Sequence, residues 1–451
     1  ADETFLRRNI PTGPDAPSIY KDIHCAPPES LIVKLAEVIG NFKTTRKMAM
    51  FWCRVVDELR RLWADEVYIP GIPLDEHPDL NTCLLFQHLE VINCCLSRKR
   101  RRILHAESLE TITRAASSDS DDVVLPTDSS LSGRILYAQV NSGERVLRLG
   151  ADRLVEDLKM LETGEPIYAP ITQEGPLLTE DLIRENEEFV LRTKSVGAGC
   201  SQLLSDMQAF KAANPGCILE DFVRWHSPPD WSEQIDSICE AEESSSRGHL
   251  SSRMQKEGNL WRELWETSKA VPAIKQAPLY DEELAVEGIL DDLEDIQPSS
   301  LFEQLFLSLL GLGFVMAEPR LSDHELSKLF FECKDYVAVT CHGSNWAEKV
   351  DDLCQVYETV QTMLTNSEDV LKKFKQADDT ISKGGEPKRR FRLLGLNFGS
   401  KDRSLRNPSP EESSDEASGA KSSLFSKKPP KPKAAEDASA DGRDEIEWAI
   451  V

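Results

Sequence analysis

The sequence predicts a mainly α-helical protein, and three observations carry this prediction. Residues 44–66 and 280–375 place apolar side chains three and four positions apart, with charged residues on the opposite face. No internal repeat and no series of alternating strands is evident. Asn-Pro-Gly and Pro-Pro breaks separate the periodic stretches. We therefore expect helices packed on helices, joined by polar linkers.

Length and composition narrow the class of protein. The 451 residues are too many for one ordinary domain, and 40% apolar with 29% charged residues is typical of a folded chain with solvated linkers. A formal net charge of −25 argues against nucleic-acid binding, because phosphate attraction needs a basic face. The eleven cysteines contain no CxxC pair, so we predict no metal site and no cofactor. We expect the cysteines to be small core residues of a reduced, intracellular protein.

Residues 1–106 are expected to form an N-terminal helical region, with helices near 31–40, 44–66 and 82–104. The third helix runs into five consecutive basic residues, 98–102. Such a run can be a nuclear-import or anionic-membrane patch. We favour the alternative that it is a solvated helix end, where positive charge complements the helix dipole.

Three further regions follow. Residues 107–148 contain SSDSDD and read as a disordered linker. Residues 149–380 are dense in pattern and predict a second folded region, beginning with a helix from residue 153, a Gly-Pro turn and another helix. Residues 381–451 are rich in Pro, Ser, Lys and Glu and predict a disordered tail. The most apolar run, 305–315, is too short to span a bilayer, and no signal peptide is found.

The second region is organised around residues 203–276. Two apolar, aromatic flanks surround an acidic, serine-rich bridge at 235–252, and a lone arginine, Arg253, follows that bridge. We expect the aromatic flanks to be a rigid base that presents a mobile arginine to a partner. The side chains expected to be largely buried in this base are Trp225, Trp261 and Trp265.

Local reasoning leaves the candidate site residues open. The chain lacks GxGxxG, GxxxxGK[ST], HExxH and GxSxG, so no independent catalytic constellation is proposed. His226 is favoured as a half-buried polar residue over a general base. Arg224 follows acidic residues at i−4 and i−3, which favours ion pairing and stacking near Trp225 over a catalytic role. Arg253 has no acidic residue at those positions, and a surface role is favoured from local pattern alone.

Three segments of the sequence favour a functional role for Arg253 over a surface role. They are TGEPIYAPITQE at 163–174, LLSDMQAFKAANPGCILEDFVRWHSPPDW at 203–231, and SSRM followed by NLWRELWETSKAVPA, which ends at residue 273. In this order they resemble the C-terminal catalytic region of the catalytic subunit of the Rab-three GTPase-activating protein. The resemblance covers residues 150–280 firmly and the surrounding helices loosely.

The resemblance implies an enzyme activator that stimulates hydrolysis of GTP by a GTP-bound Rab GTPase. The family's catalytic arginine lies in a Ser-x-Arg-Met context, which here is Arg253. The resemblance also implies a non-catalytic partner subunit, a role in vesicle or endoplasmic-reticulum membrane traffic, nucleotide exchange on another Rab, and a cytoplasmic location with only peripheral membrane contact, at the endoplasmic reticulum. The alternative is a helical scaffold or exchange-factor subunit, in which Arg253 is only a surface residue.

The end of the tail offers a separate hypothesis. Trp448 and Val451 lie three positions apart, after acidic residues. This pattern resembles the short motif by which disordered tails bind ubiquitin-like proteins of autophagy, where an extended peptide adds to a sheet edge. A chance pairing of an aromatic and an aliphatic residue is the equally weighted alternative.

Overall fold

The computed structural model describes residues 19–117, 135–193, 199–232, 248–342 and 346–372. Its longer elements are helical, which confirms the mainly α prediction. The helices before residue 120 are α1 (Ile19–Asp22), α2 (Leu31–Gly40), α3 (Thr45–Ala64) and α4 (Leu84–Ser117). Those after it are α5 (Glu180–Thr193), α6 (Gly199–Ala213), α7 (Leu219–His226), α8 (Leu260–Thr267), α9 (Glu282–Glu294), α10 (Pro298–Leu321), α11 (Ser327–Cys341) and α12 (Val350–Thr365).

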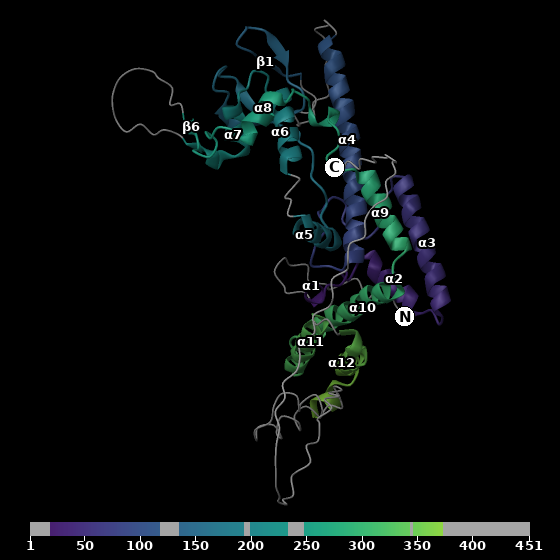
Figure 1. The fold of residues 1–451 in the computed structure, drawn as a ribbon. Helices are drawn as coiled ribbons and strands as arrows, with labels where there is room; N and C mark the ends of the chain where they lie inside the picture. Colours follow the sequence, from purple (N-terminus) through teal and green to yellow (C-terminus); the bar gives the residue numbers. More distant parts are fainter. Residues whose placement is uncertain (1–18, 118–134, 194–198, 233–247, 343–345, 373–451) are drawn as a thin grey trace, which may run out of the picture. The chain divides into compact units, whose positions relative to one another are not determined.

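The helices α3, α4 and α9 pack together (Figure 1) although α9 follows the others by more than 160 residues in sequence. Thr44 caps α3, because its hydroxyl accepts a hydrogen bond from the amide of Lys47. The buried indole of Trp52 on α3 donates to the carbonyl of Leu293 on α9 at 2.8 Å. The N-terminal helical region and the chain after residue 280 therefore share one core.

Helix α10 packs against α1, α2, α11 and α12. Two of its glycines lie at close approaches, since a Cβ at Gly311 would lie 2.6 Å from the Cys25 sulfur and one at Gly313 would lie even closer to the ring of Tyr357. This helix is longer than the apolar run seen in the sequence. Among the described residues it is the one helix long and apolar enough to cross a membrane, by length and composition alone. Its buried positions include Leu310 and Phe314.

The strands form three two-stranded antiparallel hairpins: β1 (Tyr137–Gln139) with β2 (Arg145–Leu147), β3 (Ala151–Lys159) with β4 (Pro166–Pro170), and β5 (Trp231–Ser232) with β6 (His249–Leu250). The expected helix from residue 153 is wrong, because the chain there is β3. Val155 and Leu158 are three positions apart, which fits a helix but would point to opposite faces of a regular strand. A register irregularity between Leu154 and Lys159 lets both contact the same core.

The expected linker at 107–148 also differs from the structure. Helix α4 continues to Ser117, and residues 137–147 form the β1–β2 hairpin. Residues 118–134 and the predicted tail, 381–451, lie outside the described residues. The other boundaries proposed for the regions stay predictions.

The breaks around α6 and α7 confirm the sequence reading. Helix α6 ends at Ala213, directly before Asn214-Pro-Gly, and Gly216 has a φ of +87° that favours glycine. Helix α7 ends at His226, before Pro228-Pro229. These two short helices carry Phe210, Phe222 and Val223 into a core that underlies the candidate site.

Candidate functional site

The candidate site is built on the β5–β6 hairpin, which lies close to α7 (Figure 1). Trp231 pairs with Leu250 in its register. Gly248 is required beside this pair, because a Cβ would lie 2.5 Å from the carbonyl oxygen of Ser232. The hairpin brings the residue before β5, Asp230, next to the residues that follow β6.

Arg253 forms an ion pair with Asp230, the carboxylate that we call the arginine seat. Its Nε donates to Oδ1 of Asp230 at 2.6 Å, and its Nη2 donates to Oδ2 in a second, very short hydrogen bond. The arginine side chain is 65% exposed, whereas that of Asp230 is 7% exposed. The guanidinium is therefore at the surface and its carboxylate partner is below it.

Asp230 is held by other donors as well. The hydroxyl of Ser227 donates to Oδ2 at 2.7 Å and the hydroxyl of Ser251 donates to Oδ1 at 2.8 Å. The hydrogen bond from Arg253, followed by those from the two serines, holds the pKa of Asp230 well below its usual range, despite the burial that opposes this shift. The same pairing raises the pKa of Arg253. The carboxylate is thus ionised and four times hydrogen-bonded.

The backbone around Arg253 is anchored on both sides. Met254 is 2% exposed and lies in the core beneath the site, and its amide donates to the carbonyl of Ser251 at 2.9 Å. The side-chain amide of Asn259 donates to the carbonyl of Arg253 at 3.1 Å. The expectation of an uncommitted arginine is therefore wrong, and its mobility stays a prediction. Its partner is distant in sequence, so inspection of positions i−3 and i−4 missed it.

The aromatic base is present, but its tryptophans are less buried than expected. Trp225, Trp261 and Trp265 pack against the core as partly buried residues, and α8 contains no fully buried residue. The fully buried rings are Phe210 and Phe222. Trp225 stacks on Phe210 at 5.2 Å between centroids, and the tryptophans of α8 lie 5.8 and 5.7 Å from Phe222. Helix α8 covers the core with one face, and its other face is exposed to solvent.

Arg224 has the structural role expected for it. Its Nη1 donates to the carbonyl of Lys159 at 2.7 Å and lies 3.6 Å from Asp221. Its guanidinium lies over the ring of Trp231, 5.7 Å from the centroid, rather than over Trp225 as predicted. Arg224 therefore ties β3 and α7 to the first residue of the hairpin.

His226 also has a structural environment. Its Nε2 lies 3.3 Å from Oδ2 of Asp206, and its ring stacks on Phe222 at 5.0 Å. The side chain is 31% exposed, and packing between an aspartate and an aromatic ring explains its position. Nothing in this geometry pairs it with a nucleophile.

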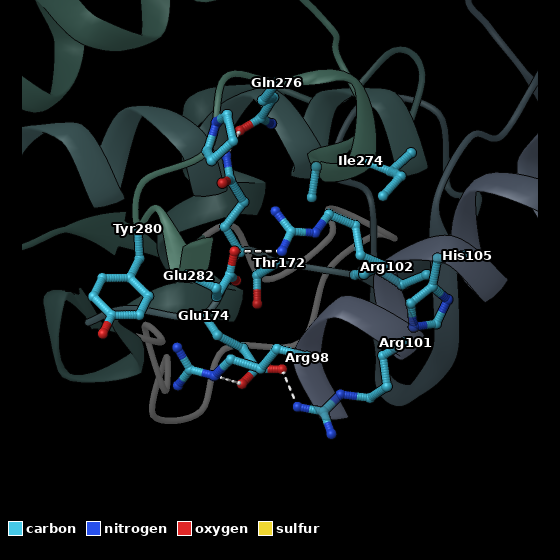
Figure 2. Close-up of a pocket in the computed structure, with 14 residues that line it drawn as sticks. Arg98, Arg101, Arg102, His105, Thr172, Glu174, Ile274, Gln276, Tyr280 and Glu282 are labelled. Atoms are coloured by element: carbon cyan, nitrogen blue, oxygen red, sulfur yellow. Dashed lines mark hydrogen bonds and ion pairs between the residues drawn. The ribbon is translucent and has the colours of Figure 1, made fainter. Parts of the chain in front are cut away.

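A second cluster lines a pocket of about 120 Å³ beside α4 (Figure 2). Arg98 and Arg101 both contact Glu174, and Arg102 pairs with Glu282. The buried Arg98 also donates to the carbonyl of Gly175 at 2.6 Å. The five-residue basic run is thus in the middle of α4, and the favoured reading of it as a helix end is wrong. Arg98 and Arg101 join α4 to the segment before α5, and Arg102 joins α4 to the start of α9.

In the described part of the chain, a surface arginine paired with a buried carboxylate lies above an aromatic core. Comparison with known proteins shows what the chain is similar to. Residues 144–294 match the family described as the Rab3 GTPase-activating protein catalytic subunit. That span contains α6, α7, α8 and both members of the Asp230–Arg253 pair.

Whole proteins with the same description are similar over longer stretches. Over 68% of this chain's length, the sequence is 33% identical to the subunit of Drosophila melanogaster. Over 81% of this chain's length, it is 30% identical to the subunit of Homo sapiens. The aligned parts cover 35% and 43% of those two relatives, so the chain spans less than half of their length. These matches confirm the resemblance indicated by the three motifs. No solved structure matches the chain.

Proposed function

We propose that this chain stimulates GTP hydrolysis by a Rab family GTPase and that Arg253 is the arginine finger. The observation that carries the proposal is the exposed guanidinium of Arg253, seated on a buried carboxylate within the span that matches the family. Relatives named for Rab3 GTPase activation support Rab GTPases as the partner class.

The chemistry agrees with this geometry. Negative charge develops on the γ-phosphoryl oxygens and on the bridging oxygen as GTP is hydrolysed. An arginine supplied by a partner protein stabilises that charge and accelerates hydrolysis by about 10³–10⁵-fold. Its planar fork can contact two oxygens at once, which lysine does less well. The chain supplies this positive group, while the GTPase supplies the nucleotide, the metal and the attacking water.

Single-turnover hydrolysis tests the proposal. A panel of GTP-loaded Rab proteins is mixed with this chain, and phosphate release is measured beside nucleotide exchange. We expect at least one Rab to hydrolyse GTP faster while its exchange rate stays unchanged. Faster exchange without faster hydrolysis would instead support the exchange-factor alternative. No effect on either rate, despite binding, would support a scaffold.

Several assignments extend the proposal. A non-catalytic subunit as partner, peripheral location at the endoplasmic reticulum and exchange on another Rab are carried by the resemblance, and affinity purification with mass spectrometry tests the first. Trp448 and Val451 lie outside the described residues. For them we retain binding to a ubiquitin-like autophagy protein, with an expected Kd of about micromolar. Equal binding of a peptide from the last twelve residues with both side chains changed to alanine would contradict it.

A further inference from the structure

The guanidinium of Arg253 has two distinct edges. Asp230 occupies the edge formed by Nε and Nη2. A guanidinium has five N–H donors, so the pair uses two of them and leaves three. Within the described part of the chain, Nη1 of Arg253 donates no hydrogen bond. The free donors are therefore on the outer part of a side chain that is 65% exposed.

The carboxylate of Asp230, which binds the Nε–Nη2 edge of the guanidinium, is itself fixed by several hydrogen bonds. Its two oxygens accept from Arg253 and from the hydroxyls of Ser227 and Ser251. The backbone repeats the same connection, because the amide of Ser251 donates to the carbonyl of Asp230 at 2.8 Å. Asp230 is held at both its side chain and its main chain, and is itself 5% exposed. A seat this rigid restricts the orientation of the arginine.

We propose that Asp230 is a positioning residue for Arg253, which keeps one edge of the guanidinium bound while the other edge contacts the phosphate oxygens of the GTPase-bound nucleotide. This inference rests on the proposed function. A long, free arginine would lose rotamer freedom each time it entered the nucleotide site. An arginine that is already oriented avoids much of this entropy loss. Its orientation should therefore raise the maximal rate of GTP hydrolysis, measured when the Rab is saturated with the chain.

Asp230→Asn tests this role, since it keeps the shape of the side chain but replaces one acceptor oxygen with a donor. The measurement is single-turnover hydrolysis by a responsive Rab over a series of concentrations of the chain. We expect the maximal rate to fall on the order of 10²-fold, as for a misplaced catalytic group. The half-saturating concentration should change by less than about twofold, because binding of the Rab does not depend on one oriented edge.

Matched variants separate positioning from folding. Asp65→Asn removes an acceptor from the exposed pair with Arg61 and should leave the rate unchanged. In an Arg253→Ala background, Asp230→Asn should have no further effect on the rate. A similar additional loss in that background would mean that Asp230 acts through stability. A higher rate in Asp230→Asn would mean that the pair restrains the arginine, and would overturn the proposal.

A second readout does not depend on activity. Phenylglyoxal modifies free guanidinium groups, and peptide mass spectrometry reports its rate at each arginine. Asp230→Asn should increase modification of Arg253 severalfold and leave that of Arg61 unchanged. An unchanged rate at Arg253 would show that Asp230 does not hold it. If the wild-type chain accelerates no Rab, the proposed function fails, and this assay still decides whether the seat exists in solution.

Discussion

The side-chain amide of Asn214 pairs with the backbone of Tyr168 in both directions. Its Oδ1 accepts from the amide of Tyr168 at 2.8 Å, and its Nδ2 donates to the carbonyl of the same residue at 2.8 Å. Asn214 is fully buried and also accepts from Nη1 of Arg148 at 3.0 Å. One side chain thus fixes the end of α6 to β4, which positions the core below the arginine seat.

We expect Asn214→Ala to lower the free energy of unfolding by at least about 2 kcal/mol, because it leaves the amide of Tyr168 without its acceptor and leaves Nη1 of the buried Arg148 with the carbonyl of Ala213 alone. Urea denaturation followed by tryptophan fluorescence measures this change. Asn141→Ala is the control, since its amide contacts Glu162 at the surface and its loss should cost little. Equal stability of the two variants would contradict the role assigned to Asn214.

Replacing two neighbouring rings of the aromatic base with alanine should lower the free energy of unfolding by unequal amounts. Phe222 is fully buried, so Phe222→Ala should cost about 3–5 kcal/mol. Trp261 is only partly buried, so Trp261→Ala should cost about 2 kcal/mol. Thermal unfolding of both variants checks this order. If Trp261→Ala kept the wild-type melting temperature but weakened binding of the Rab, Trp261 would be a partner contact.

The sequence predicted the parts of this site that depend on neighbouring residues. The ends of α6 and α7 follow from Asn-Pro-Gly and Pro-Pro, which act within a few positions. The Asp230–Arg253 pair could not be predicted in this way, because 23 positions separate its members and the β5–β6 pairing brings them together. The strand β3 was missed for a related reason, since an irregular register let apolar residues at a helical spacing contact the same core.

Glu90 makes stability depend on pH. It is 3% exposed on α4, and burial raises its pKa to about 7, against the hydrogen bond from the amide of Asp79. The folded state therefore binds a proton that the unfolded state has lost above about pH 4.5. Stability should fall as pH rises between about 4.5 and 7, at up to about 1.4 kcal/mol per pH unit.

Glu90→Gln should remove this slope and make the protein more stable than wild type at pH 8, because glutamine carries no charge to bury and still accepts from Asp79. Denaturation midpoints over a pH series measure the effect. Glu110→Gln, at an exposed position of the same helix, is the control and should follow the wild-type curve. An unchanged slope in Glu90→Gln would show that another group causes it.

The pocket beside α4 predicts a modest, salt-sensitive contribution. Glu174 contacts the buried Arg98 and the more exposed Arg101, but its own side chain is 45% exposed. Glu174→Gln should therefore cost about 1 kcal/mol at low ionic strength and less at high salt. Thermal unfolding at two salt concentrations measures this. A cost that did not change with salt would indicate that packing, rather than charge, joins these segments.

The rate of GTP hydrolysis with Arg253→Ala tests the central claim most directly. A responsive Rab is mixed under single-turnover conditions with wild-type chain, Arg253→Ala, Arg253→Lys, or Arg61→Ala, which changes an exposed arginine outside the candidate site as a control. We expect Arg253→Ala to lose most of the stimulation while the affinity for the Rab and the circular-dichroism spectrum stay the same. Arg253→Lys should also be poor, and Arg61→Ala should match wild type. Wild-type stimulation by Arg253→Ala would contradict the account.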